Sequence, residues 1–303
     1  MKYLVILFIL SFIYACGDDT VNNSANTLPD FDIYLIKKDF QNNLVSTYTI
    51  KSDGTDLKLF NDSMGVSSNS YHNKILVSTL PGLTDTIHIS DYDGRNMTSI
   101  SLGNYFGSNF SLSPKADKFN FTALTQQLFV MNVDGSGLVE ISSYQFNHCK
   151  FSPSGNMIAY LEPSYFPNHR GTKLFISNTS GTYKKLLKDS IQDGGFAEWS
   201  NDGKKIAYHY LSFDLQTYRI CVIDTSRNSF TVLADGGFPA WSPNGNKICF
   251  VDYIGNRSDI FLMNTDGTNI VNISNTTTRD ESNIKWSKDG MKILYNSYEP
   301  SQP

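Results

Sequence analysis

Histidines are the side chains in this chain best suited to bind a metal ion or to transfer protons near neutral pH. The five are His72, His88, His148, His169 and His209. A metal-dependent sugar lyase would need several of them to converge with carboxylates. The strand pattern instead distributes them over a turn, an outer strand, the first strand of a repeat, a loop and a strand end. The sequence therefore predicts no catalytic centre, no metal and no cofactor.

A peptidase is the other enzyme class that we considered. It would need an α/β-hydrolase domain with a Gly-x-Ser-x-Gly nucleophile turn. The chain has neither that motif nor the length for such a domain. We therefore expect a protein that is not an enzyme.

Six residues, one of them His148, stand at fixed steps before a repeated Phe or Trp and could contact a ligand. They are His148, Lys150, Phe196, Glu198, Phe238 and Lys285. Side chains alternate along a strand, so we expect those one step and three steps before the large residue to share a face. Lys150 and Glu198 come from neighbouring repeats and should form an ion pair.

Two segments between repeated strands are longer than their counterparts, Glu162 to Thr172 and Tyr210 to Thr217. Their candidate binding residues are Tyr165, Phe166, His169, Arg170, Tyr210, Phe213 and Asp214. Aromatic residues and Arg on exposed loops are typical of protein-binding hot spots. The alternative is that these aromatics only cap the strand ends.

Two recurring turns predict the fold that positions these residues. One is a large residue followed by Ser and a turn usually closed by Gly, as in Trp241-Ser242-Pro243-Asn244-Gly245. The other is an Asp-Gly hairpin, as in Asp266-Gly267. Each joins two strands, and the two alternate at a period of about 40 to 50 residues, which is typical of a propeller. The sequence predicts an all-β protein, a six-bladed β-propeller of four-stranded antiparallel blades.

The first blade lacks its first strand, because the repeat begins with Asp32-Ile33-Tyr34-Leu35. We expect residues 283–287 to supply that strand, so that N- and C-terminal strands share one blade and close the fold. Residues 292–295 compete with residues 33–36 for the second strand of that blade. The sequence leaves this competition open.

The first residues resemble a secretory leader rather than part of the fold. An apolar run from Leu4 to Ile13 is too short to span a bilayer and ends at Tyr14-Ala15-Cys16. We predict a lipoprotein signal peptide over 1–15, a lipidated Cys16 with a flexible tether over 16–30, and the propeller over 31–303. An ordinary signal peptide cut elsewhere is the alternative.

The net charge restricts the classes of partner that we expect, and the cysteine positions indicate how the thiols are used. Removing Lys2 with the leader leaves 24 Lys and Arg against 29 Asp and Glu, a net charge of −5, so nucleic acid is not expected. Cys149, Cys221 and Cys249 lie in strand patterns and are expected to be buried thiols. Membrane contact is expected through the lipid alone.

The segments Ser90-Asp91-Tyr92-Asp93-Gly94 and Pro239-Ala240-Trp241-Ser242-Pro243 resemble the TolB-like six-bladed propellers of the bacterial cell envelope. The resemblance covers Phe31 to Tyr295 and omits the separate N-terminal domain of TolB. It implies that the first strand of each blade lines a central channel, so that the six ligand candidates face it. It also implies that the long loops share one rim.

The function expected from this resemblance is a lipid-anchored envelope binding module for a protein, peptide or glycan. It would be an outer-membrane lipoprotein, facing the periplasm or the cell surface. A metal-dependent oligosaccharide lyase and a purely structural subunit are the alternatives, and a water-filled structural channel is the alternative to a ligand site there.

Overall fold

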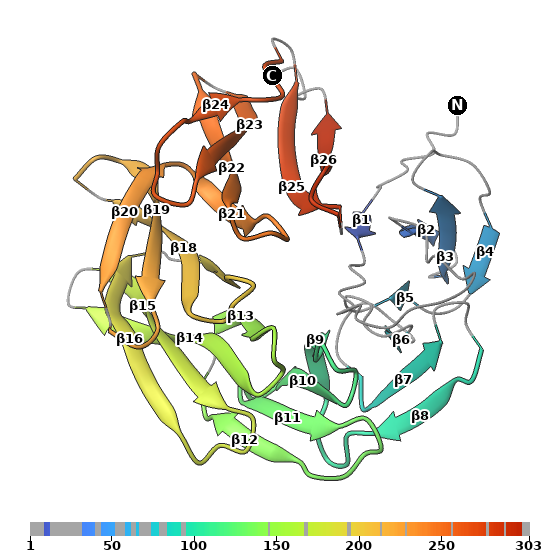
Figure 1. The fold of residues 1–303 in the computed structure, drawn as a ribbon. Coiled ribbons are helices and arrows are strands. Elements are labelled where there is room, and N and C mark those ends of the chain that lie inside the picture. The colour runs from blue at the N-terminus through green and yellow to red at the C-terminus, as the bar shows by residue number, and fades with distance from the viewer. Residues whose placement is uncertain are drawn as a thin grey trace, which may run out of the picture. The chain divides into compact units, whose positions relative to one another are not determined.

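The computed structural model describes residues 9–12, 32–39, 44–51, 58–61, 65–66, 74–78, 84–91 and 95–298. Within the last range it omits residues 145, 167–168, 193–194, 213, 228, 256, 277–278 and 288. The chain divides into two units, Met1–Ser143 and Tyr144–Pro303. The described residues form strands and turns (Figure 1), and none of their segments is a helix long and apolar enough to cross a membrane.

The first unit contains three antiparallel four-stranded sheets, each in chain order. The first sheet is β1 (Ile9–Phe12), β2 (Asp32–Asp39), β3 (Leu44–Lys51) and β4 (Lys58–Asn61). The second is β5 (Gly65–Val66), β6 (Lys74–Ser78), β7 (Thr86–Asp91) and β8 (Thr98–Ser101). The third is β9 (Gly107–Leu112), β10 (Lys118–Ala123), β11 (Leu128–Asn132) and β12 (Val139–Ser142).

The second unit contains three more four-stranded sheets and a terminal strand pair. The first sheet is β13 (Phe146–Phe151), β14 (Met157–Phe166), β15 (His169–Asn178) and β16 (Lys184–Gln192). The next is β17 (Gly195–Trp199), β18 (Lys205–Ser212), β19 (Thr217–Asp224) and β20 (Phe230–Asp235). Then come β21 (Gly237–Trp241), β22 (Lys247–Ile254), β23 (Arg257–Asn264) and β24 (Val271–Asn272), followed by β25 (Asp280–Trp286) and β26 (Ile293–Tyr298). Within this unit, β13 and β21 lie on the inner side of the curve in Figure 1, and β16 and β20 on the outer side.

The Ser of the recurring turn is a structural residue. In the turn after β17, Ser200 is 5% exposed, and its Oγ accepts the N–H of Lys205 at 2.9 Å. The N–H of Gly203 donates to the Ser200 carbonyl at 2.8 Å, and Gly203 has φ of 68°, which suits Gly. The turns at Ser152, Ser242 and Ser287 repeat these bonds. The motif therefore reverses the chain, as the sequence indicates.

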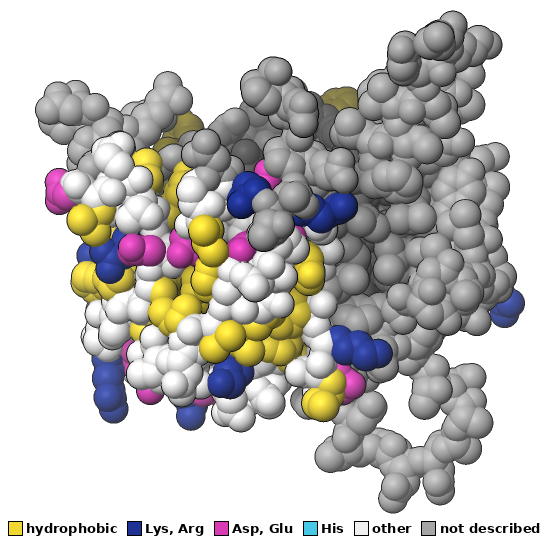
Figure 2. Space-filling view, turned by 90° about the horizontal axis from the view of Figure 1, so that it is seen from above, with side chains coloured by type: hydrophobic (Ala, Val, Ile, Leu, Met, Phe, Trp, Pro, Cys, Tyr) yellow, Lys and Arg dark blue, Asp and Glu magenta, His cyan; other side chains and the backbone are white. Residues whose placement is uncertain are grey.

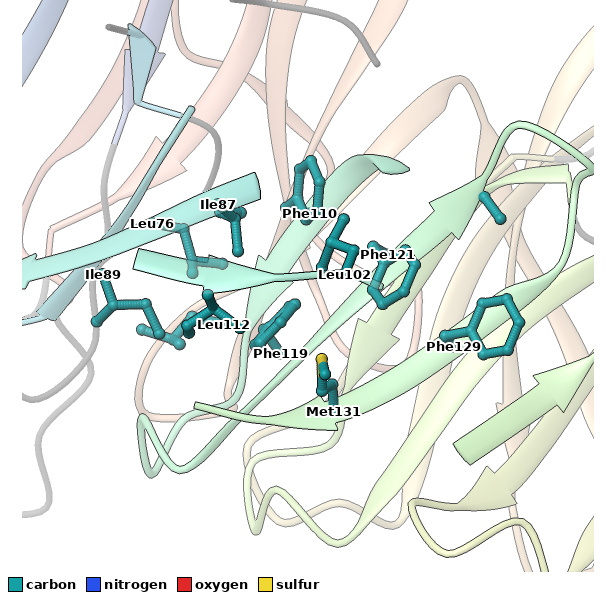
Figure 3. Packing of buried hydrophobic residues seen from close by; sticks show 12 residues of the cluster. Leu76, Ile87, Ile89, Leu102, Phe110, Leu112, Phe119, Phe121, Phe129 and Met131 are labelled. Atoms are coloured by element: carbon teal, nitrogen blue, oxygen red, sulfur yellow. The ribbon is translucent and has the colours of Figure 1, made fainter. Parts of the chain in front are cut away.

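Aromatic and aliphatic side chains of adjacent sheets form the core of the first unit (Figure 3). Leu76 and Ile87 come from the second sheet, while Phe119 and Phe121 come from the third, and all four are fully buried. Burying a side chain of this size contributes about 1.5 to 3 kcal/mol. Packing between successive sheets thus stabilises the repeat, as expected of a propeller.

The second unit has two comparable clusters. One joins Leu174 and Ile176 of β15 to Trp199 and Ile206 of the next sheet, and the other joins Ala207 of β18 to Trp241 and Ile248. Cys221 and Cys249 are buried free thiols, and Cys149 is a partly buried one. Burial raises the pKa of Cys221 to about 11 and that of Cys249 to about 12. These thiols pack as small apolar groups, as expected.

The shared terminal sheet expected from the sequence is not observed among the described residues. β2 pairs with β1, which lies inside the predicted leader, with Ile9 opposite Ile36 and Phe12 opposite Ile33. β25 pairs with β26, with Trp286 opposite Ile293. Residues 33–36 and 293–295 therefore both form second strands, but in different sheets. The first segment pairs with β1 and the second pairs with β25.

Candidate functional site

A ladder of indole hydrogen bonds aligns the first strands of the second unit. Each Trp at the end of such a strand donates its Nε1–H to a carbonyl on the preceding first strand. Trp199 donates to Lys150, Trp241 to Glu198 and Trp286 to Ala240, each at 3.1 Å. The accepting residues stand one step before the large residue of their own strand. The ladder therefore holds this position at one level across β13, β17, β21 and β25.

A group of charged side chains occupies that level, and we call Lys150, Glu198, Ala240 and Lys285 the lysine layer. Lys150 Nζ lies 3.0 Å from Glu198 Oε1, so the expected ion pair is present, with both side chains about one third exposed. The pKa of Lys285 is lowered to about 8, mainly by burial and to a smaller extent by the nearby Lys150, while Glu198 acts to raise it. The layer thus carries two cations and one anion.

A β-bulge interrupts the first strand just before this layer. In β21, Ala240 lies opposite Cys249 but Gly237 lies opposite Val251, so three steps on β21 match two on β22. The same mismatch occurs in β9, β17 and β25. One extra residue on a strand breaks its alternation of faces. The expectation that Phe238 shares a face with Ala240 by simple alternation therefore fails.

Phe238 occupies the bulge in a backbone conformation that disfavours it. Its φ is 54°, and the corresponding residues of β9 and β25 are Asn109 at 52° and Asn283 at 54°. Asn tolerates the left-handed region, whereas a bulky residue there is strained by about 1 to 3 kcal/mol. The Phe238 side chain is nevertheless 41% exposed. Core packing does not account for an aromatic residue here.

His209, in the middle of β18, contacts Phe238 through a hydrogen bond and its ring. The Phe238 N–H donates to His209 Nδ1 at 3.1 Å, and the two ring centroids are 4.9 Å apart. Tyr218 meets the His209 ring edge-on at 5.3 Å. His209 itself is only 5% exposed. The bond to Nδ1 places the proton of the neutral ring on Nε2 and fixes the orientation of the imidazole.

The connection between β20 and β21 packs against the β18–β19 hairpin. Gly236 donates its N–H to the Tyr218 carbonyl at 2.7 Å, and it has φ of 123°. A Cβ at Gly236 would lie 2.7 Å from the Val251 carbonyl, so only Gly fits. Arg219 and Asp235 pair nearby at 2.7 Å. The β20–β21 connection and the β18–β19 hairpin therefore lie together on one rim in this part of the chain.

Exposed apolar side chains extend along this rim. Leu215 lies in the β18–β19 turn at 57% exposure, and Tyr253 and Ile254 end β22 at 59% and 51%. We call Leu215, Phe238, Tyr253 and Ile254 the hairpin rim. Figure 2 shows that the described part of one face mixes hydrophobic patches with acidic and basic side chains.

Two titratable groups beside the hairpin rim have raised pKa values. Burial is the main cause of the raised pKa of Tyr210, and Cys221 adds to it. Burial also raises the pKa of Asp252, to which the negative charge of Asp235 contributes. Asp214 is exposed in the β18–β19 turn.

Several predicted site residues are only partly covered by the structure. The segment expected to be a loop at 162–172 is instead the outer end of the β14–β15 hairpin, where Tyr165 lies opposite Arg170 and Phe166 opposite His169. The ladder continues through Pro163 and Gly171, although Pro and Gly are depleted in strands. His148 and Phe196 lie in β13 and β17. The structure does not describe the side chains of Tyr165, Phe166, His169, Arg170, His148 and Phe196. Cys16 and Phe213 lie wholly outside the described residues.

His209 is the functional candidate that the sequence prediction missed. It was assigned to a strand end and separated from Phe238 by 29 residues of chain. A signal was present, because the same strand position holds Thr122, Leu161 and Val251 in other repeats, none of them titratable. Alignment of the repeats would have identified His209 as the exception.

The chain was compared with known families and structures. Residues 157–303 match the family described as TolB beta propeller domain. Among curated proteins, no sequence matches the chain. A solved structure described as a putative TolB from Agrobacterium tumefaciens is 18% identical, covers 73% of this chain and 80% of its own, and has a TM-score of 0.57.

Two further solved structures share the fold at lower identity. Oligogalacturonate lyase from Vibrio parahaemolyticus is 10% identical, covers 97% of this chain and 88% of its own, and has a TM-score of 0.68. The β-propeller domain of the Trilobed protease from Pyrococcus furiosus is 10% identical, with coverage of 90% and 87% and a TM-score of 0.63. Likeness at this identity extends to the fold and not to the activity.

Proposed function

We propose, from the premise that this chain is a TolB-like β-propeller protein, that it is a non-catalytic binding module of the bacterial cell envelope. Its hairpin rim binds a protein, peptide or glycan partner. The lipid on Cys16 holds the module at the outer membrane, facing the periplasm or the cell surface. The match of residues 157–303 to the TolB beta propeller domain supports an envelope setting.

The observation that carries this proposal is the exposed, strained Phe238. β9 and β25 have Asn at this left-handed bulge position, whereas β21 has an aromatic residue that is 41% exposed. Backbone strain is concentrated at functional sites, and aromatic residues dominate binding hot spots. Leu215, Tyr253 and Ile254 extend the apolar surface around it. A rim of this composition suits a partner with its own apolar side chains.

The matched test replaces Phe238 with Asn, the residue that β9 and β25 have at the same position. Phe238→Asn keeps the bulge conformation and removes the ring, so the fold should be retained. Crosslinking capture from envelopes, with the captured species identified by mass spectrometry, should lose the partner taken by the wild type. Tyr253→Ser should weaken the same capture.

The control removes an even more exposed apolar side chain from the turn that follows β25. Met291 is 80% exposed in the turn between β25 and β26, and Met291→Ser should leave capture unchanged. Triple alanine replacement of Tyr165, Phe166 and Phe213 tests whether the predicted rim residues also take part. Unchanged capture by both Phe238→Asn and the triple variant would refute the binding rim and favour a structural subunit.

The metal content of the purified protein distinguishes a binding module from the oligosaccharide lyase that the sequence left as an alternative. A lyase of that class would hold a metal ion at one equivalent. The proposal expects no stoichiometric metal after purification in metal-free buffer. Stoichiometric metal, together with cleavage of an acidic oligosaccharide, would contradict it.

The proposed arrangement of the mature chain is a six-bladed fold whose terminal strands share one blade. Removal of residues 1–15 would take β1 away from β2 and free the hydrogen-bonding edge of Asp32–Asp39. A C-terminal strand would then cover that edge, as unpaired edges tend to be covered. If that edge is covered, amide hydrogen exchange of Asp32–Asp39 in the mature chain should be slow at consecutive residues, because β3 protects one half of the N–H groups and the covering strand the other half. Fast exchange at every other residue, where the N–H points to the freed edge, would contradict closure.

A further inference from the structure

We infer that the lysine layer binds a carboxylate group, held between Lys285 and Lys150 over Ala240. This site is separate from the hairpin rim, so its test does not depend on the binding partner proposed above. Its ligand class is a compound or side chain with a single carboxylate.

The charge balance of the layer leaves one cation without a counter-ion. Lys150 and Glu198 neutralise each other across 3.0 Å. Among the described residues, no carboxylate lies within ion-pair distance of the Lys285 amine. Lys285 is nevertheless partly buried and close enough to both charges to be affected by them. A partly buried charge is costly unless it is paired, so the layer favours one added negative charge.

The residue at the centre of the layer has a small side chain. Sheet contacts place β21 between β17 and β25, so Ala240 stands between Glu198 and Lys285. Its side chain is a single methyl group, and Ala240 is partly exposed. The carbonyl of Ala240 already accepts a hydrogen bond from the Trp286 indole, which holds β21 and β25 together at this level. A ligand over Ala240 would reach Lys285 without moving the backbone.

Glu198 sets the selectivity for a single negative charge. An anion that approaches the two lysines also approaches the Glu198 carboxylate, which repels it. A carboxylate carries one charge over two oxygens, and two ammonium groups can bind both. With two cations and one anion, the layer is neutralised by a single negative charge, whereas a phosphate dianion would leave an excess negative charge beside Glu198. The geometry therefore favours a carboxylate over a phosphate.

The experiment titrates two probes into the folded protein at pH 6.5 and follows binding by NMR chemical shifts or calorimetry. One probe is propionate, and the other is a blocked Ala-Glu-Ala peptide with its Ala-Gln-Ala counterpart. The Glu peptide should bind and the Gln peptide should not. Equal affinity for propionate and the Glu peptide would identify a free carboxylate as the ligand, whereas tighter binding of the peptide would identify an acidic protein segment.

Three variants test the residues. Lys285→Met should weaken binding by about tenfold or more, because a charge-assisted hydrogen bond is lost. Glu198→Gln should strengthen it, since the repulsion disappears and Lys150 is released. Lys204→Met, on an exposed turn, is the matched control and should change nothing. Because Lys285→Met removes a buried charge, the variant should fold, which a thermal melt will check.

Two further measurements complete the test. Binding to the wild type should decline as the pH rises through about 8, where Lys285 loses its proton. Inorganic phosphate, titrated at a pH of about 7.5 where it is mostly the dianion, should bind more weakly than propionate at the same pH. Unchanged binding by Lys285→Met, or phosphate binding as tightly as propionate, would overturn the inference.

Discussion

Ser258 of β23 and Glu281 of β25 exchange two hydrogen bonds between their sheets. Ser258 Oγ donates to the Glu281 carbonyl at 2.9 Å, and the Glu281 N–H donates to Ser258 Oγ at 3.1 Å. Both residues are buried, Glu281 at 1% exposure. The Glu281 carboxylate accepts hydroxyl hydrogen bonds from Ser274 at 3.0 Å and Thr276 at 2.9 Å. This network ties the last strand pair to the sheet before it.

Replacing Glu281 should therefore destabilise the second unit. Glu281→Ala removes the carboxylate that accepts the Ser274 and Thr276 hydroxyls and should lower the free energy of unfolding by about 2 to 4 kcal/mol. Glu281→Gln keeps one oxygen and should lower it less. Urea unfolding measures both, and Glu140→Gln on an exposed strand should change the midpoint little. A loss below that of the Glu140 control would contradict a stabilising role.

The indole ladder predicts a second stability effect. Trp241→Phe keeps most of the buried ring but removes the donor to the Glu198 carbonyl, and should lower the free energy of unfolding by about 1 to 2 kcal/mol. Trp286→Phe should behave alike, since it removes the bond to Ala240. Chemical unfolding followed by circular dichroism provides the measurement. Wild-type stability in both variants would show that the ladder aligns strands without stabilising them.

The left-handed bulge position predicts unequal changes in stability for two reciprocal substitutions. Asn283→Phe places a bulky residue at φ of 54° and should lower the free energy of unfolding by about 1 to 3 kcal/mol. Phe238→Asn relieves that strain and loses only the contact with the His209 ring, so stability should change by less than about 1 kcal/mol. Thermal unfolding compares the pair. A larger loss for Phe238→Asn would mean that Phe238 is a packing residue.

The lowered pKa of Lys285 predicts that the stability difference between the wild type and Lys285→Met depends on pH. Its pKa in the folded protein is about 8, below the ordinary value of 10.5, so the unfolded chain binds more protons between these pH values. The contribution of Lys285 to the free energy of unfolding therefore becomes more favourable as the pH rises from 8 to 10.5. Lys285→Met should be more stable than the wild type at pH 7, and the difference should narrow over that interval. A difference that is constant with pH would contradict the burial of a charged lysine.

Much of the fold could be predicted from the sequence because its signals are local. The Ser-x-x-Gly turns and Asp-Gly hairpins specify strand reversals through backbone preferences of a few residues. The Lys150–Glu198 pair was also predictable, because it needs only the strand period and the adjacency of repeats. The long hairpin at 162–172 was mistaken for a loop, since a strand that projects beyond its sheet has no period that separates it from a loop.

What the sequence alone determined is the repeating four-stranded sheet, the structural role of its turns and the positions that carry charge. Only the tertiary structure decided that Phe238 rests on His209, that Ala240 separates Glu198 from Lys285, and which strands the termini pair with. The reason is physical. Turn and strand preferences act over neighbouring residues, whereas a bulge, a buried charge and a strand edge depend on partners that are distant in the chain.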